Sequence, residues 1–168
     1  MNRALMDELV VKFRESYDAC CKDGIWQQQS ATFRRFWLEK VLSQGTEPIP
    51  DDDCDVVIRI LDRNGKGNTK ESEAVARTMV TQGAWRRLFN ALHTDRKLAM
   101  LVDSALKEED SDRKASLIDD LYKANEGKGN RLTGEGANVL DTLLAVYDPV
   151  NNLSMISLND RKAPMDFF

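Results

Sequence analysis

The stretch LTGEGANVLDTLL, residues Leu132–Leu144, carries the clearest local pattern in this chain. A Gly-x-Gly turn at Gly134 and Gly136 opens it. A helical apolar stripe follows at Val139, Leu140, Leu143 and Leu144. Such a turn can direct successive backbone N–H groups at a phosphate, and the start of the following helix adds a partial positive charge. The stretch therefore predicts a helix that begins directly after a candidate phosphate-binding turn.

Helical spacing of apolar residues continues through nearly the whole chain, and it predicts an all-α fold. We expect a single compact helical domain over residues 1–168, with roughly seven to nine helices. The apolar end of the chain, Met165–Phe168, would suit a domain cut from the N-terminal part of a longer chain. The expected core residues are Phe36, Trp37, Leu88, Phe89, Leu101 and Leu117.

Glycines and capping residues predict where the first helices begin and end. A first helix is expected from Leu5 to about Gly24, which leaves Trp26 in a connector. Ser30 or Thr32 is the expected N-cap of a second helix that ends near Gly45.

Acidic residues predict the later helix starts. Three aspartates at 51–53 suit the first turn of a helix, although the β-branched run after them could also form a strand. The acidic start and the lack of strand partners favour a helix. Thr94 or Asp95 is expected to cap another helix, Ser111 or Asp112 the next, and Asp148–Pro149 to end the last.

Composition limits the function classes. The chain of 168 residues is 42% hydrophobic and 31% charged, which predicts a folded protein. Its net charge of −4 weighs against a general electrostatic nucleic-acid binder. Two arginine pairs, Arg34–Arg35 and Arg86–Arg87, could form local basic faces, but adjacent residues point apart on a helix, so solvated surfaces are the favoured interpretation.

Cysteine and histidine content argues against disulfides and metal. The three cysteines, Cys20, Cys21 and Cys54, do not form a disulfide framework, and a single histidine argues against a Cys/His zinc site. The N-terminus mixes charged with apolar residues, unlike a signal peptide, and no apolar run reaches the about 18 residues of a membrane span. We expect a cytoplasmic protein without cofactor, metal or membrane contact.

Residues Asp62–Glu73 resemble a calcium-binding EF-hand loop. Lys66 and Lys70 occupy the fifth and ninth positions, where oxygen ligands are needed, so calcium is not expected. His93 is the single histidine, and its place before Thr94–Asp95 favours a helix C-terminal cap over a catalytic base. No nucleophile-elbow or P-loop motif accompanies it.

Residues 132–136, followed by Leu143–Leu144, resemble the hairpin of helix-hairpin-helix DNA-binding domains. The resemblance implies a turn that holds a DNA phosphate through Gly134 and Gly136, with Lys128 and Arg131 as nearby cations and residues 114–125 as the preceding helix. A side chain at either glycine would then block the contact sterically or by disfavouring a positive φ. Glu135 departs from the family by placing a carboxylate between the glycines.

The related DNA glycosylases imply a catalytic aspartate near Asp160, although Asn138 stands where their lyase-type members have a lysine. Residues 130–134, Tyr147–Pro149 and 157–161 also resemble helical regions that accompany nuclease or ATPase domains in prokaryotic restriction and defence proteins. That second resemblance implies a non-catalytic region fused to an effector.

The sequence thus predicts a non-catalytic helical recognition module of a prokaryotic restriction, defence or DNA-processing protein. It would bind DNA phosphate through Gly134, Gly136, Lys128 and Arg131, or dock a protein partner or a fused effector domain. The alternative is a protein-binding adaptor or inhibitor with no nucleic-acid role. A third reading is a glycosylase-like enzyme that uses Asp160.

Overall fold

The fold is all-α in the computed structural model, which describes residues 3–17, 19–43, 45–61, 78, 80–134, 136–153, 157–159 and 161–162. Seven α-helices lie within these residues, in keeping with the predicted fold class. They are α1 (Arg3–Ser16), α2 (Ala19–Phe36), α3 (Asp51–Leu61), α4 (Gln82–Thr94), α5 (Arg96–Lys107), α6 (Ser111–Ala124) and α7 (Asn138–Tyr147). A π-helical turn, η1 (Trp37–Val41), extends α2.

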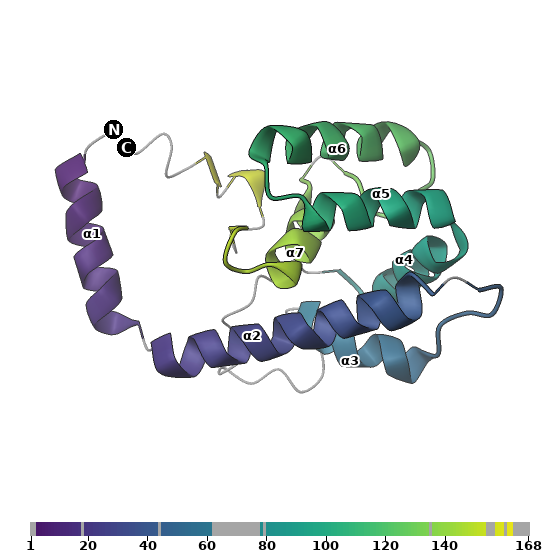
Figure 1. Ribbon diagram of the computed structural model, residues 1–168, viewed down its shortest axis with the longest axis horizontal. Coiled ribbons are helices and arrows are strands. Elements are labelled where there is room, and N and C mark those ends of the chain that lie inside the picture. The colour runs from purple at the N-terminus through teal and green to yellow at the C-terminus, as the bar shows by residue number, and fades with distance from the viewer. Residues whose placement is uncertain are drawn as a thin grey trace.

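Helix α7 lies at the centre of the fold. Every residue from Val139 to Val146 is buried, and the helix packs against α2, α3 and α5. Helices α5 and α6 form a neighbouring layer on one side, while α2 and α3 lie on the other (Figure 1). A helix with apolar residues over most of its circumference belongs in such a position, since little of its surface can meet water favourably.

The first helical segment differs from the prediction. The break falls at about Tyr17 instead of Gly24, and Gly24 and Trp26 both lie inside α2. A Cβ at Gly24 would meet nothing within 4 Å, so the glycine occupies an open surface where it costs the helix only about 1 kcal/mol. Burial of Phe33 farther along α2, and of Trp37 in η1, outweighs that cost.

Ser30 contacts another helix and does not act as the predicted N-cap. Its buried hydroxyl donates to the carbonyl oxygen of Tyr147 at 2.8 Å, and the guanidinium of Arg34 donates to the same oxygen at 3.2 Å. That carbonyl lies in the last turn of α7, where no intrahelical donor remains. Side chains of α2 thereby provide hydrogen-bond donors for the last turn of α7.

The predicted starts of the later helices are largely confirmed. The aspartates at 51–53 begin α3, which is a helix and not a strand. Asp95 caps α5 by accepting a hydrogen bond from the N–H of Leu98 at 3.0 Å. Asp110, one residue before the predicted cap, accepts from the N–H of Arg113 and begins α6.

The core contains four of the six predicted residues. Phe36, Trp37, Leu88 and Phe89 are buried, whereas Leu101 and Leu117 are only partly so. Trp37 also makes a polar contact, because its indole N–H donates to the buried carboxylate of Asp103 at 3.0 Å. No helix among the described residues is long and apolar enough to cross a membrane.

Candidate phosphate-binding site

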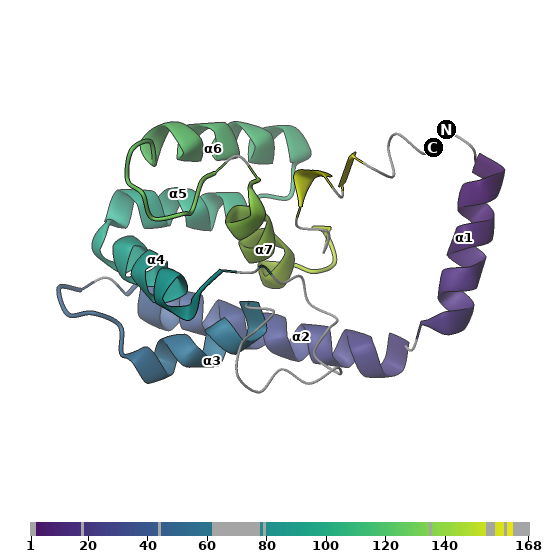
Figure 2. The same ribbon diagram turned by 180° about the vertical axis from the view of Figure 1, so that it is seen from behind.

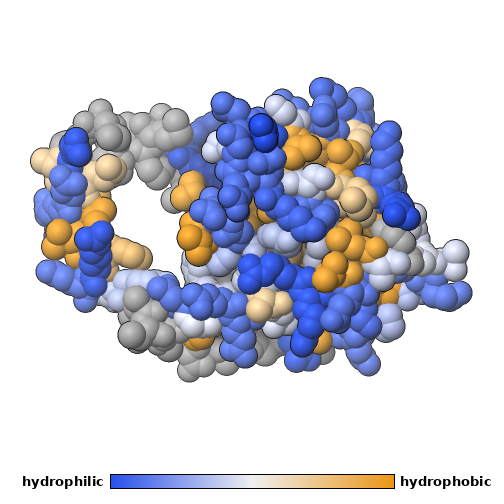
Figure 3. Space-filling model, in the orientation of Figure 1, coloured by the Kyte–Doolittle hydropathy of each residue, from blue (hydrophilic) through white to orange (hydrophobic). Residues whose placement is uncertain are grey.

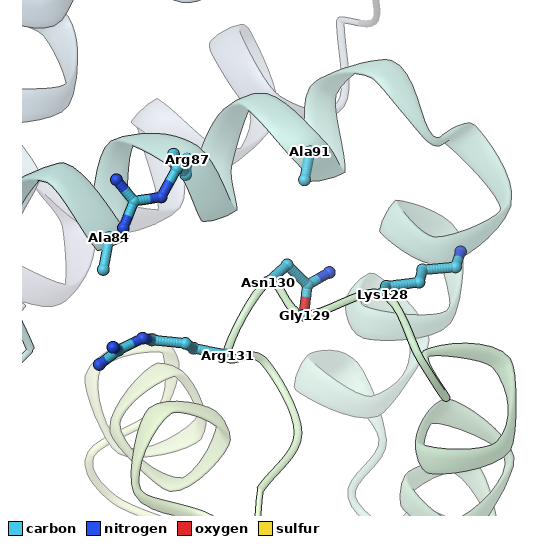
Figure 4. Close-up of a pocket in the computed structure, with 7 residues that line it drawn as sticks. All are labelled: Ala84, Arg87, Ala91, Lys128, Gly129, Asn130 and Arg131. Carbon is cyan, nitrogen blue, oxygen red and sulfur yellow. The ribbon is translucent and has the colours of Figure 1, made fainter.

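Arg131 borders two surface hollows that together contain all four residues predicted to bind phosphate. The first, which we call the arginine pocket, has a volume of about 320 Å³. It is lined by Ala84, Arg87, Ala91, Lys128, Gly129, Asn130 and Arg131 (Figure 4). The second, the turn pocket, has a volume of about 260 Å³ and includes Gly134, Gly136 and Ala137.

The wall of the arginine pocket formed by α4 follows from residue spacing. Ala84, Arg87 and Ala91 recur at intervals of three and four, so they share one face of the helix. The two alanines are small and partly or fully buried. They leave room for the loop that follows α6 to approach α4, and Arg87 is the one long side chain on that face of the pocket.

The opposite wall is a loop held by reciprocal amide bonds. The side chains of Asn125 and Asn130 donate to each other at 2.9 and 2.8 Å, and Asn130 also accepts from the N–H of Leu132 at 3.1 Å. Leu132 is fully buried, which anchors the end of the loop. Arg131 lies between these contacts with a φ of 65°, a conformation that non-glycine residues seldom adopt. The packing on both sides therefore fixes where the Arg131 side chain leaves the backbone.

Two of the pocket's cations have no partner among the described residues. The exposed side chains of Arg87 and Arg131 make no hydrogen bond or ion pair with any described residue. In Figure 4 both guanidinium groups extend toward the Ala84 end of the pocket. Two like charges at one end of a hollow repel each other, and an anion between them would relieve that repulsion.

Lys128, by contrast, is already paired. Its ammonium group contacts the carboxylate of Asp95 at 2.5 Å, and its side chain points to the end of the pocket away from the arginines (Figure 4). The hydrogen bond from Lys128 is the main reason why the pKa of Asp95 lies below its ordinary value. Lys128 thus closes the loop onto the start of α5, which leaves it a weaker candidate for phosphate than its sequence position implied.

The turn pocket lies at the N-terminus of α7, as predicted. Ala137 is the N-cap residue, with a φ of 50° and no side-chain hydrogen bond to the helix. The carbonyl oxygen of Gly134 accepts from the hydroxyl of Tyr122 at 3.0 Å and from the N–H of Ala137 at 3.0 Å. These bonds attach the turn to α6 and close it onto the start of α7.

The expected left-handed glycines lie elsewhere in the loop. Positive φ values occur at Gly127, Gly129, Arg131 and Ala137 among the described residues, and not at Gly134 or Gly136. A Cβ at Gly134 would meet open space, so a side chain there is tolerated. At Gly136 it would lie 3.2 Å from the side-chain oxygen of Asn138, which folds over the turn. The expectation that Gly134 and Gly136 adopt positive φ values is therefore wrong.

A buried carboxylate opposes anion binding at the turn pocket. Asp141 lies in the first turn of α7, where its side chain is 8% exposed. Its Oδ1 contacts Arg161 at 3.2 Å, and its Oδ2 has no hydrogen-bond partner. Asp141 therefore adds a negative charge beside the helix start at neutral pH, which weighs against an anion at the turn pocket.

Two other basic residues, Arg86 and Lys40, are paired with aspartates. Arg86 contacts Asp51 at 3.4 Å and Asp55 at 2.5 Å, which ties α4 to α3. Lys40 contacts Asp53 at 2.8 Å. In each adjacent arginine pair one member is bonded, Arg34 to the carbonyl oxygen of Tyr147 and Arg86 to aspartates, so neither pair forms a continuous basic face.

His93 has a structural role that differs from the predicted cap. Its ring is buried, and Nδ1 lies 2.7 Å from the carbonyl oxygen of Lys40. The histidine thus joins α4 to the end of η1, where carbonyls lack helical partners. Gly45 lies against the same ring, since a Cβ there would be 2.9 Å from Nε2.

Several predicted features fall outside the described residues. These are Glu135, Asp160 and the whole of the EF-hand-like loop at 62–73. Within the described residues, no group of three or more potential metal ligands is present.

The connection between α6 and α7 differs from the turn of a helix-hairpin-helix domain. Helix α6 packs on α5, whereas α7 packs on α2, and residues 125–137 separate the two. A helix-hairpin-helix turn would instead join them directly.

The chain matches no protein-family model, no curated protein and no solved structure.

Proposed function

We propose that this chain is a non-catalytic helical recognition module that contacts the phosphate backbone of DNA through the arginine pocket. One observation carries the proposal: Arg87 and Arg131 come from separate elements, line one hollow and have no partner among the described residues. Arginine is suited to this contact because its planar group can donate two parallel hydrogen bonds to a phosphate.

The net charge limits the strength of this contact. A chain with a net charge of −4 repels the DNA polyanion, and two arginines provide about two counterion-releasing contacts. Binding should therefore be weak, independent of DNA sequence and detectable mainly at low salt. Any base-specific contact would come from a partner or a fused domain, as in the restriction and defence context that the sequence predicts.

The test is a fluorescence-anisotropy titration of short duplex DNA over a range of salt concentrations. Arg87→Ala and Arg131→Ala should each lower the slope of log affinity against log salt by about one. Lys128→Ala should lower it less, because that ammonium group already pairs with Asp95. Arg113→Ala is the matched control, since Arg113 is an exposed arginine in a hollow that also contains Glu108, Asp112 and Asp120.

Two results would overturn the proposal. Absence of DNA binding at low salt would remove it altogether. Binding that Arg87→Ala and Arg131→Ala affect no more than Arg113→Ala does would place the contact elsewhere. The alternative, a protein-binding adaptor without a nucleic-acid role, has one observation in its favour, which is the exposed apolar face of α1.

A further inference from the structure

Helix α1 is amphipathic and contributes no buried residue to the fold. It stands apart from helices α3–α7 in both ribbon views, and the space-filling view shows apolar side chains on it (Figures 1, 2 and 3). Leu9, Val10 and Phe13 are 43%, 41% and 57% exposed. With Met6, they recur at the spacing of one helix face. An isolated helix of about 14 residues is marginal in water, so this face needs a partner.

Charges flank the apolar face in two separate rows. Glu8 and Lys12 lie on one side and contact each other at 2.7 Å, with side chains that are 58% and 66% exposed. Asp7 and Arg14 lie on the other side, as helical spacing requires. Arg3 also lies on the second side, one turn before Asp7. Between residues 7 and 14, each row carries its acid toward the N-terminus and its base toward the C-terminus.

This arrangement is self-complementary when two copies of α1 run antiparallel. Antiparallel helices bring like rows together. With the twofold axis at Val10, Glu8 lies level with Lys12 of the second copy. Asp7 then lies within one residue, about 1.5 Å along the axis, of Arg14 of the second copy. A parallel pair would instead place Asp7 beside Glu8 and Arg14 beside Lys12, which are repulsive contacts.

We propose that α1 is a self-association element, in which two copies of this chain pair through antiparallel α1 helices. The apolar face of Met6, Leu9, Val10 and Phe13 forms the contact, and the two charge rows set its direction. The equal numbers of acidic and basic residues on α1 favour a second copy over an anionic membrane surface, which would select a basic helix.

The pairing is weak and depends on protein concentration. A helix of 14 residues is about 21 Å long, and two such helices bury less than the about 1,600 Å² of a standard interface. Association is therefore expected in the range of about 10 µM to 1 mM.

Sedimentation equilibrium of the whole chain over that range tests the proposal. Val10→Glu should abolish the dimer, because it places a charge at the centre of the contact. Val11→Glu is the matched control: Val11 is the adjacent valine, is 54% exposed and points away from the apolar face, so its substitution should leave the dimer intact. Neither change should lower the melting temperature of the fold, since α1 contributes no buried residue.

Charge reversal tests the direction of the pairing. Glu8→Lys and Lys12→Glu should each weaken self-association, because each places like charges opposite one another. A mixture of the two variants should form a heterodimer, since every opposed pair is then of opposite sign.

A chain that remains monomeric at 1 mM would overturn the proposal, as would equal effects of Val10→Glu and Val11→Glu. A mixture of the charge variants without heterodimer would overturn the antiparallel arrangement.

Discussion

Asp141→Asn should stabilise the protein, and the gain should grow as the pH rises. The Asp141 carboxylate is buried in α7, with Oδ2 unpartnered and Oδ1 in contact with Arg161. Burial raises the pKa of Asp141 from the ordinary 3.8 to about 6, and the nearby Arg161 offsets only part of that rise. The folded protein consequently holds the Asp141 proton more tightly than the unfolded chain does.

The sign and size of the effect follow from proton linkage. The stability contributed by protonated Asp141 is fully present below pH 3.8 and is lost as the pH rises through about 6. At about 1.4 kcal/mol for each pKa unit, the loss reaches about 3 kcal/mol at pH 8 and about 1.6 kcal/mol at pH 5. The pKa already includes the attraction of Arg161, so no separate correction for that ion pair is needed.

Urea denaturation of the wild type and Asp141→Asn at pH 5 and pH 8 measures this difference. The gain in unfolding free energy should be larger at pH 8 by about 1.4 kcal/mol. Asp119→Asn, on the exposed face of α6, is the control and should show no such difference. An equal gain from Asp141→Asn at both pH values would mean that Asp141 does not titrate between them, and the reasoning would be refuted.

Two further predictions concern buried contacts between helices. Asp103→Ala should lower the free energy of unfolding by about 2 to 3 kcal/mol, because the indole N–H of Trp37 loses its acceptor in the core. Asp103→Asn should recover most of that loss in a urea titration, and equal losses in both variants would argue against the hydrogen bond. Gly45→Ala should cost about 1 to 3 kcal/mol, because its Cβ would lie 2.9 Å from Nε2 of His93. The ring cannot move away without straining its 2.7 Å contact with Lys40, so an unchanged thermal melt would contradict this account.

Local chemistry explains why several helices could be predicted. The starts of α3 and α5 depend on aspartates that lie within a few residues of the N–H groups they stabilise. The predicted boundary between the first two helices was wrong, because Gly24 indicates a break in the helix, whereas the packing of Phe33 and Trp37 in the core keeps the helix continuous through Gly24. A contact between residues that are distant in sequence cannot be predicted from one segment alone. Ser30 is a second example, because its partner is Tyr147.

The candidate site was likewise predictable only in part from the sequence. The sequence by itself determined an all-α chain and pointed to the glycine-rich loop that carries Arg131. Only the tertiary structure decided which cations remain available, because charge neutralisation is a contact between distant segments. Lys128 is paired with Asp95 from the start of α5, while Arg87 from α4 is brought to the loop with its charge unpaired by any described residue. Helical spacing determines which face a side chain occupies, and packing determines what that face meets.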